Sequence, residues 1–505
     1  MTTMTTSIGA SSAAINAKSW DNLPWNKLNK HVVRLQMRIA KAVREGKKGK
    51  VKALQRILTS SFYAKCLAVK RVTSNKGAKT PGVDGIIWNN SLQKIQAVTV
   101  LKKKGYHPLP LRRIYIPKKG NKLKLRGLSI PAIFDRAMQA LWHMALEPIA
   151  EEWADPNSYG FRPKRSTHDA IEQCFKVLCR KTSAKVIFEG DIKACFNNID
   201  HDFLLKNIPM DKTILKKFLK ADFMEKKVIY PTESGVPQGG IISPTIAVMA
   251  LSGLEKKIKS LFNKKHHKVN FIGYADDFII TGASKALLDG LVIPVVRSFL
   301  QERGLEISEE KSRITNIEDG FNFLGFNIRK YNNDKLLIKP SKANVKSFLS
   351  EIKSIIKTNI PAKTENLIFL LNPKIRGWAN YFSHAVSSST FSYVDCQIMG
   401  ALWRWMKHRH PNKRVSWIAR KYLKRKDIIS SRLGASFKDK DGNQIPIFIR
   451  YACDTSIRRH IKIRSDANPY NPKFKEYFEY RGNTSNTRMS NGCKEIRFAQ
   501  ELVGQ

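Results

Sequence analysis

Two adjacent carboxylates, Asp276 and Asp277, stand at the centre of an apolar and aromatic run that extends from residue 271 to residue 280. Such a run predicts two β-strands joined by a tight turn, with the carboxylates at the turn. Two negative charges at the edge of a buried sheet repel each other unless a divalent cation neutralises them. The pattern therefore indicates a magnesium site, although an Asp-Asp pair taken alone is more often an ordinary hairpin with a solvated acidic turn, so the rest of the chain must decide.

A third carboxylate, Asp191, ends a second predicted strand within the mostly apolar segment 185–192. Metal-assisted phosphoryl transfer uses two cations about 3.5–4 Å apart, held by carboxylates from separate segments. Asp191, Asp276 and Asp277 supply such a set. We therefore expect them to form one catalytic and metal-binding site for two Mg²⁺ ions, for which Mn²⁺ can substitute.

Three blocks in this order resemble the catalytic signature of the reverse transcriptases. They are Asp191 with an aromatic residue five positions on at Phe196, the segment 235–244 around Gln238, and the Tyr-Ala-Asp-Asp box at 274–277. The resemblance implies an RNA-directed DNA polymerase that uses dNTPs. It also implies that the ring of Phe196 lies under the nucleotide sugar and excludes a 2′-hydroxyl, and that Gln238 lies near the base and sugar.

Residues 116–131 resemble the fingers hairpin of the same family. There Lys118 and Arg126 are expected to grip the incoming triphosphate, for which a guanidinium fork is well suited. Gly127 stands where relatives usually carry proline, which should loosen the turn. The alternative is that Lys118 and Arg126 are simply two of the 90 basic residues. Lys311, in a later block that resembles the family, is also expected to contact the nucleotide.

Residues 158–163 resemble the block that lines the template groove. Its aromatic side chains could stack on bases while its arginine holds a phosphate. The expected nucleic-acid contacts are Tyr159, Phe161 and Arg162. The alternative is that these residues belong to the core.

The composition independently indicates a nucleic-acid partner. Lys and Arg total 90 against 41 acidic residues, which gives a net charge of +49. A surplus of that size points to a polyanion or to membrane lipid. A membrane-spanning helix is excluded because no run of about 18 apolar residues occurs. The seven cysteines include no C-x-x-C pair, so neither a zinc site nor a disulfide framework is expected.

The N-terminal part divides into two predicted segments. Residues 1–17 are rich in Ser, Thr and Ala and are expected to be disordered, without support for a targeting signal. Residues 18–95 have helical apolar spacing, for example at Val32, Leu35 and Ile39, and Val51, Leu54 and Leu58 are expected to share a second face with Phe62. The basic opposite faces favour RNA contact. This segment resembles the N-terminal extension of group II intron reverse transcriptases.

Helical spacing returns after Ser341, a candidate N-cap. Residues 371–382 then resemble the maturase motif, or domain X, which identifies the chain as a member of the group II intron-encoded reverse transcriptases. The resemblance implies contact with intron RNA through Arg376, Trp378 and Tyr381. Without the family, the same aromatic run indicates a helix core, and both interpretations can hold for different faces.

Residues 401–465 are the most basic long stretch, with 18 Lys and Arg against four Asp. Aromatic residues interleaved with cations suit nucleic-acid binding. The expected contacts are Arg404, Lys407, Arg409, Lys413 and Arg414. By resemblance, the region after domain X contacts target DNA. Residues 458–470 resemble the lead-in to an HNH endonuclease that is expected to be absent or truncated, with His460 structural.

The sequence thus predicts an α+β right-hand polymerase. Fingers and palm with an antiparallel sheet occupy residues 96–335, an α-helical thumb or domain X 336–430, and a basic DNA-binding extension 431–505. Its expected function is to copy intron RNA into DNA for homing and to assist splicing of the host intron. The alternatives are a splicing maturase with little or no polymerase role and, less favoured, an RNA-dependent RNA polymerase. A bacterial cytoplasm or an organelle is the expected compartment, and the oligomeric state is left open.

Overall fold

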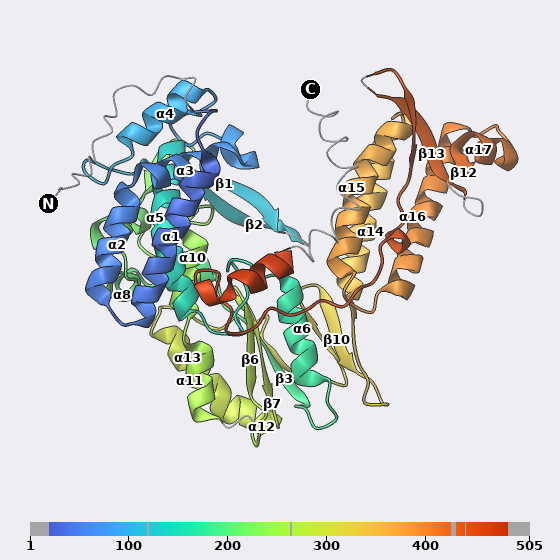
Figure 1. Ribbon diagram of the computed structural model, residues 1–505. Coiled ribbons are helices and arrows are strands. Elements are labelled where there is room, and N and C mark those ends of the chain that lie inside the picture. Colours follow the sequence, from blue (N-terminus) through green and yellow to red (C-terminus); the bar gives the residue numbers. More distant parts are fainter. Residues whose placement is uncertain (1–19, 119–120, 263–264, 426–430, 440, 483–505) are drawn as a thin grey trace. The chain divides into compact units, whose positions relative to one another are not determined.

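The structure, a computed structural model, describes residues 20–118, 121–262, 265–425, 431–439 and 441–482 (Figure 1). The segment 1–17, predicted to be disordered, lies outside these residues. The chain divides into two compact units. Unit 1 comprises Met1–Ser166, Phe188–Ile314 and Ile463–Tyr480. Unit 2 comprises Thr167–Ile187, Thr315–Lys462 and Arg481–Gln505.

Unit 1 begins with helices that pack their apolar faces inward. α1 (Trp25–Arg44) buries Val32 and Ile39, as their spacing predicts, and exposes most of its basic side chains. The prediction that Phe62 continues the apolar face of the next helix is wrong. The chain bends at Ser61, so Phe62 begins a new helix and is 39% exposed. The other elements here are α2 (Lys48–Ser60), α3 (Phe62–Thr73), η2 (Lys76–Lys79) and α4 (Ser91–Val100).

The hairpin expected between residues 111 and 130 is present as β1 (Leu111–Lys118) and β2 (Asn121–Ile130). The two strands pair antiparallel, and two short strands extend the sheet in the order β2-β1-β4-β5. The added strands are β4 (Phe223–Glu225) and β5 (Val228–Tyr230). The helix that follows the hairpin, α5 (Ile133–Trp153), is buried along most of its length and packs against α1, α2 and α3.

A second sheet carries the predicted carboxylates. β6 (Asn270–Tyr274) and β7 (Asp277–Gly282) pair antiparallel and leave Ala275 and Asp276 as a two-residue turn, which confirms the predicted strand pair. Ala275 has a left-handed φ of 59°. Such a conformation at the first loop residue favours glycine, so alanine is held there at a cost in backbone strain.

In this sheet β7 lies beside β3 (Val186–Asp191), in the order β6-β7-β3-β8, with β8 at Arg313–Asn316. The strand that was expected to end in Asp191 is therefore confirmed. Shorter helices complete unit 1. They are α7 (Cys195–Asn198), α8 (His201–Asn207), α9 (Lys212–Leu219), α10 (Ser243–Leu251), α11 (Leu254–Leu261), α12 (Lys285–Leu287), η3 (Leu288–Val292), α13 (Ile293–Gln301) and η5 (Pro472–Phe474).

The segment 463–480 packs against α5 within unit 1. The Tyr470 hydroxyl donates to the Glu147 carboxylate, and Asn468 Nδ2 donates to Glu152 Oε1 at 2.8 Å. These bonds join residues more than 300 positions apart in the sequence.

Unit 2 combines long helices with two small sheets, and α14, α15 and α16 lie side by side in it (Figure 1). As predicted, Ser341 caps α14: its Oγ accepts from Asn344 N at 3.3 Å. The helices are α6 (Thr167–Leu178), α14 (Lys342–Thr358), α15 (Thr364–Phe382), α16 (Ser388–Arg409), α17 (Val415–Tyr422) and η4 (Ala452–Asp454). The strands are β9 (Phe321–Phe323), β10 (Phe326–Lys330), β11 (Leu336–Pro340), β12 (Leu423–Arg425), β13 (Ser431–Lys438) and β14 (Gln444–Phe448).

Two further predictions concern His460 and membrane-spanning helices. His460 is structural, as expected, since its Nε2 contacts Asp169 Oδ1 at 2.8 Å. Across the described part of the chain, no helix has both the length and the apolarity needed to cross a membrane.

Candidate active site

The three predicted catalytic carboxylates come from neighbouring strands. Asp191 is the last residue of β3, Asp277 is the first residue of β7, and Asp276 lies in the turn just before it. The backbone of Asp191 is fixed from two sides: Ser312 Oγ accepts from its N–H at 3.1 Å, and Ser308 N donates to its carbonyl oxygen at 2.8 Å. The carboxylates are therefore positioned by rigid strand ends.

The charges of these carboxylates interact. Partial desolvation, repulsion from Asp276 and Asp191 and a hydrogen bond with Asp191 together raise the pKa of Asp277 to about 7. Desolvation is the largest of these causes, and the repulsion is the one that a bound cation would relieve. Lys311 offsets part of this negative charge. Its Nζ donates to Asp191 Oδ2 at 2.6 Å, and this bond raises the pKa of Lys311.

The same residues suit a divalent cation chemically. Mg²⁺ prefers carboxylate oxygens, and a cation would neutralise the repulsion that raises the pKa of Asp277. Within the residues that the structure describes, no three or more His, Cys, Asp or Glu side chains are arranged as a ready metal-binding cluster. Lys311 offsets part of the negative charge of the three carboxylates in this arrangement. Metal binding by the three carboxylates stays a prediction.

Two glycines allow the surrounding segments to pack this closely. A Cβ atom at Gly190 would lie 2.3 Å from Phe278 Cζ, so the Phe278 ring can cross β3 only because residue 190 has no side chain. A Cβ atom at Gly160 would lie 2.3 Å from the backbone nitrogen of Ala275. The loop 158–161 is thus pressed directly against the turn that bears the carboxylates.

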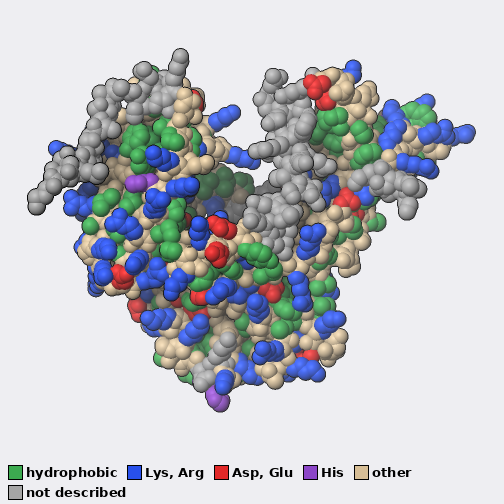
Figure 2. Space-filling model, viewed as in Figure 1, with side chains coloured by type: hydrophobic (Ala, Val, Ile, Leu, Met, Phe, Trp, Pro, Cys, Tyr) green, Lys and Arg blue, Asp and Glu red, His purple; other side chains and the backbone are tan. Residues whose placement is uncertain are grey.

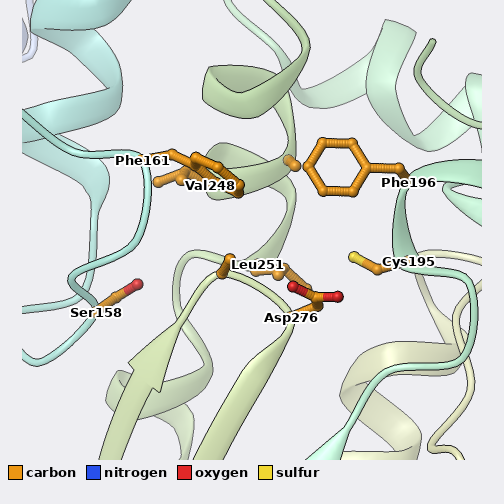
Figure 3. A pocket seen from close by; sticks show the side chains of 9 residues that line it. Ser158, Phe161, Cys195, Phe196, Val248, Leu251 and Asp276 are labelled. Atoms are coloured by element: carbon orange, nitrogen blue, oxygen red, sulfur yellow. The ribbon is translucent and has the colours of Figure 1, made fainter. Parts of the chain in front are cut away.

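The rings of Phe196 and Phe161 meet edge to face, and both line a small cavity beside Asp276 (Figure 3). Their centroids are 5.9 Å apart and their planes meet at 83°. The cavity measures about 10 Å³, which is roughly the room that one water needs. The sequence predicted that the ring of Phe196 lies under the nucleotide sugar. That role of Phe196 stays a prediction.

Gln238 lies in a loop that forms backbone hydrogen bonds with both Phe196 and the β1–β2 hairpin. Val236 N donates to Phe196 O at 2.5 Å, and Ser129 N at the end of β2 donates to Gln238 O at 2.7 Å. The Gln238 side chain is half-buried. On the hairpin itself, Arg126 is exposed, whereas the Lys118 side chain lies outside the described residues. Nucleotide contacts by these residues stay predictions.

Tyr159 and Arg162 are core residues, which corrects the expectation that they contact nucleic acid. Arg162 is 8% exposed and Tyr159 1%. The Arg162 guanidinium donates to both Glu151 oxygens at 3.0 and 2.9 Å and to the backbone oxygens of Asp155 and Ser158. A phosphate could reach this arginine only if the core opened. Phe161, in contrast, is 50% exposed.

Comparison with known proteins gives three family matches along the chain. Residues 116–328 match the reverse transcriptase (RNA-dependent DNA polymerase) family, residues 20–101 the N-terminal domain of reverse transcriptase, and residues 345–423 the group II intron maturase-specific domain. Protein YkfC of Escherichia coli is 34% identical over 317 residues, which cover 54% of this chain and 82% of the relative.

The chain belongs to the group II intron reverse transcriptase and maturase family. It is an RNA-directed DNA polymerase with a maturase domain. The group II intron-encoded protein LtrA of Lactococcus lactis is 29% identical over 423 residues, which cover 65% of this chain and 70% of the relative. A 91 kDa protein in the cob intron of Schizosaccharomyces pombe is 26% identical over 431 residues, which cover 68% of this chain and 52% of the relative.

In the maturase domain of the reverse transcriptase, the predicted RNA-binding residues of α15 also pack internally. Trp378 stacks on Phe348 with centroids 4.6 Å apart, and the Tyr381 hydroxyl donates to Leu324 O at 2.8 Å. Arg376 is half-buried on the same helix. The helix-core interpretation is therefore correct for Trp378 and Tyr381, and contact of their remaining faces with RNA stays a prediction.

The basic stretch 401–465 has two kinds of cation. Most of the predicted nucleic-acid residues are exposed: Arg404, Lys407, Lys413 and Arg414. Arg409 differs, because its Nη1 donates to Ile360 O at 2.9 Å and to Ala362 O, and its guanidinium lies 4.7 Å from the Trp405 ring. We therefore reassign Arg409 from nucleic-acid contact to stabilisation of the loop between α14 and α15.

Sequence analysis missed two contacts of the site. Lys311 was expected to bind the nucleotide, but in this structure it pairs with Asp191, which lies 120 positions earlier. Phe161 was expected to stack on template bases, but its ring meets Phe196. The only signal for either contact was the order of the family blocks, which does not specify which side chains touch.

Proposed function

We propose that the chain is a right-hand polymerase that copies the RNA of its host group II intron into DNA during intron homing. In this proposal residues 96–335 form the fingers and palm, and 336–430 the thumb and maturase domain. Residues 18–95 and 431–505 form extensions that contact intron RNA and target DNA. The observation that carries the proposal is the convergence of three carboxylates at the ends of β3 and β7, beside the ring of Phe196.

Asp191, Asp276 and Asp277 are the residues that would hold two Mg²⁺ ions, or Mn²⁺ in their place. Bound there, the ions would assist attack by the primer 3′-hydroxyl and stabilise the leaving pyrophosphate. The chain's own residues contribute positioning. β3 and β7 fix the carboxylates, Lys311 offsets part of their charge, and Phe196 supports the sugar of the dNTP.

The same chain would bind intron RNA and assist its splicing. The maturase-specific match at residues 345–423 and the net charge of +49 support this role, and LtrA is itself a group II intron-encoded protein. The alternative is a splicing maturase with little polymerase role. The coupled carboxylates favour the enzyme, because an RNA chaperone does not need three carboxylates close enough to repel one another.

Asp276→Asn separates the two roles. The variant should extend a DNA primer on an RNA template at least about 10³-fold more slowly, since misplacing the catalytic cations removes several kcal/mol of transition-state stabilisation. Binding of intron RNA and protein-assisted splicing should persist, because the cationic surfaces are unchanged. Asp289→Asn, at an exposed position on η3, is the matched control. Extension at the wild-type rate by Asp276→Asn would contradict the proposed site.

A further inference from the structure

Unit 1 has a second hollow, of about 840 Å³, between the start of α1 and α3. Its volume falls within the range of about 300–1,000 Å³ that is typical of ligand pockets. None of its residues belongs to the carboxylate site. The side chains that matter for the argument are Trp25, Lys27, Lys30, His31, Arg34 and Tyr63.

The aromatic side chains of this pocket are held in place but keep accessible faces. The rings of His31 and Tyr63 meet edge to face with centroids 4.8 Å apart, and Tyr63 is 36% exposed. Trp25 packs edge-on against the buried Trp20, and the Lys70 ammonium lies 4.0 Å from its ring centroid. Rings supported at their edges and open at a face are suited to stacking on a nucleobase.

The pocket is also strongly cationic. Lys27, Lys30 and Arg34 are exposed and follow one another at helical spacing along α1, a helix of 20 residues that contains no Asp or Glu. In the described part of the chain no carboxylate forms an ion pair with any of the three. Their charges are therefore available to an external anion, and a row of cations beside aromatic rings fits a phosphate backbone next to a base.

We propose that this pocket binds an unpaired nucleotide of RNA. The base would stack on Tyr63 with His31 at its edge, and the flanking phosphates would contact Lys27, Lys30 and Arg34. A paired base could not enter, because both of its faces and its Watson–Crick edge are already used in the duplex. The inference rests on the proposed function, namely that the chain binds intron RNA, and specifies which structural state of the RNA this part of the chain recognises.

The test compares the full-length protein's affinity for a labelled 12-nucleotide single-stranded RNA of mixed sequence and for the duplex of the same sequence. Tyr63→Leu should weaken single-strand binding by roughly 5–100-fold, the range for loss of one stacked base, and change duplex binding less than twofold. Arg34→Gln should reduce the log–log slope of single-strand affinity against salt concentration by about 0.7, the contribution of one phosphate contact. Phe62→Leu is the control for lost packing, because Phe62 contacts the Tyr63 ring but does not line the pocket.

A second readout does not depend on the variants. RNA that carries a photoreactive 4-thiouridine should crosslink to peptides containing Trp25 or Tyr63. The proposal that this pocket binds unpaired RNA would be contradicted if Tyr63→Leu left single-strand affinity unchanged or weakened duplex binding equally. Crosslinks confined to other peptides would also contradict it. Primer extension by Tyr63→Leu on a pre-annealed template should match wild type, which separates this inference from the polymerase site. If the wild-type protein binds neither RNA, both the proposed function and the proposed RNA-binding role of the pocket are wrong.

Discussion

At the scale of single residues, the proposed chemistry depends on three carboxylates whose charges interact. Desolvation and repulsion raise the pKa of Asp277 to about 7, while Lys311 pairs with Asp191 at 2.6 Å. The site therefore holds more negative charge than its single lysine neutralises. A surplus of this kind is what makes binding of a divalent cation favourable.

Phe196 is the residue for which discrimination between sugars can be tested directly. Phe196→Ala and Phe196→Val should admit ribonucleotides roughly 10–200-fold better relative to deoxynucleotides, because removing the ring removes the clash with a 2′-hydroxyl. Extension with deoxynucleotides should fall only modestly. Phe196→Tyr, which keeps the ring, is the control. Unchanged discrimination in both smaller variants would mean that Phe196 only packs against Phe161 and that selectivity lies elsewhere.

At the scale of elements, those with a strong local pattern could be predicted. The pair β6 and β7, the strand β3 and the capped helix α14 each combine a clear apolar period with a definite turn or cap. Phe62 could not be predicted, because the bend at Ser61 depends on packing between α2 and α3. Arg162 was missed for a similar reason: whether an arginine is buried depends on its partner Glu151 in another element.

The contact between loop 158–161 and the turn at Ala275 and Asp276 gives a prediction for these elements. Gly160→Ala should lower the rate of primer extension by roughly 100-fold, because the new Cβ must displace the backbone of Ala275 and with it Asp276. Thermal unfolding should show only moderate destabilisation. Gly290→Ala, where an added Cβ would meet nothing within 4 Å, is the control. Wild-type extension by Gly160→Ala would show that the turn tolerates movement.

At the scale of the whole molecule, the net charge of +49 indicates a polyanionic partner or membrane lipid. Figure 2 shows why a single patch could not be chosen from sequence: Lys and Arg side chains are spread over most of the visible face. The assignment of segment 463–480 to unit 1 was equally beyond prediction. It depends on bonds such as Asn468 to Glu152, which join distant parts of the chain.

The basic stretch 401–465 gives a prediction for the whole molecule. Changing Arg404, Lys407, Lys413 and Arg414 together to Gln should flatten the salt dependence of intron RNA binding, by up to about 0.7 in log–log slope for each phosphate that is no longer neutralised. Extension of a pre-annealed primer should change less. Arg409→Gln should instead lower the melting temperature, because its guanidinium supports backbone carbonyls. An unchanged slope in the fourfold variant would place the RNA-binding surface elsewhere.

The central claim is that Asp191, Asp276 and Asp277 hold the catalytic cations, and Mn²⁺ binding tests it most directly. Electron paramagnetic resonance can count the Mn²⁺ bound to the full-length protein with an annealed RNA template and DNA primer. Asp191→Asn should weaken at least one of two bound ions about tenfold or more and slow primer extension in parallel, while Asp289→Asn changes neither. Wild-type Mn²⁺ affinity together with wild-type extension in Asp191→Asn would contradict the claim.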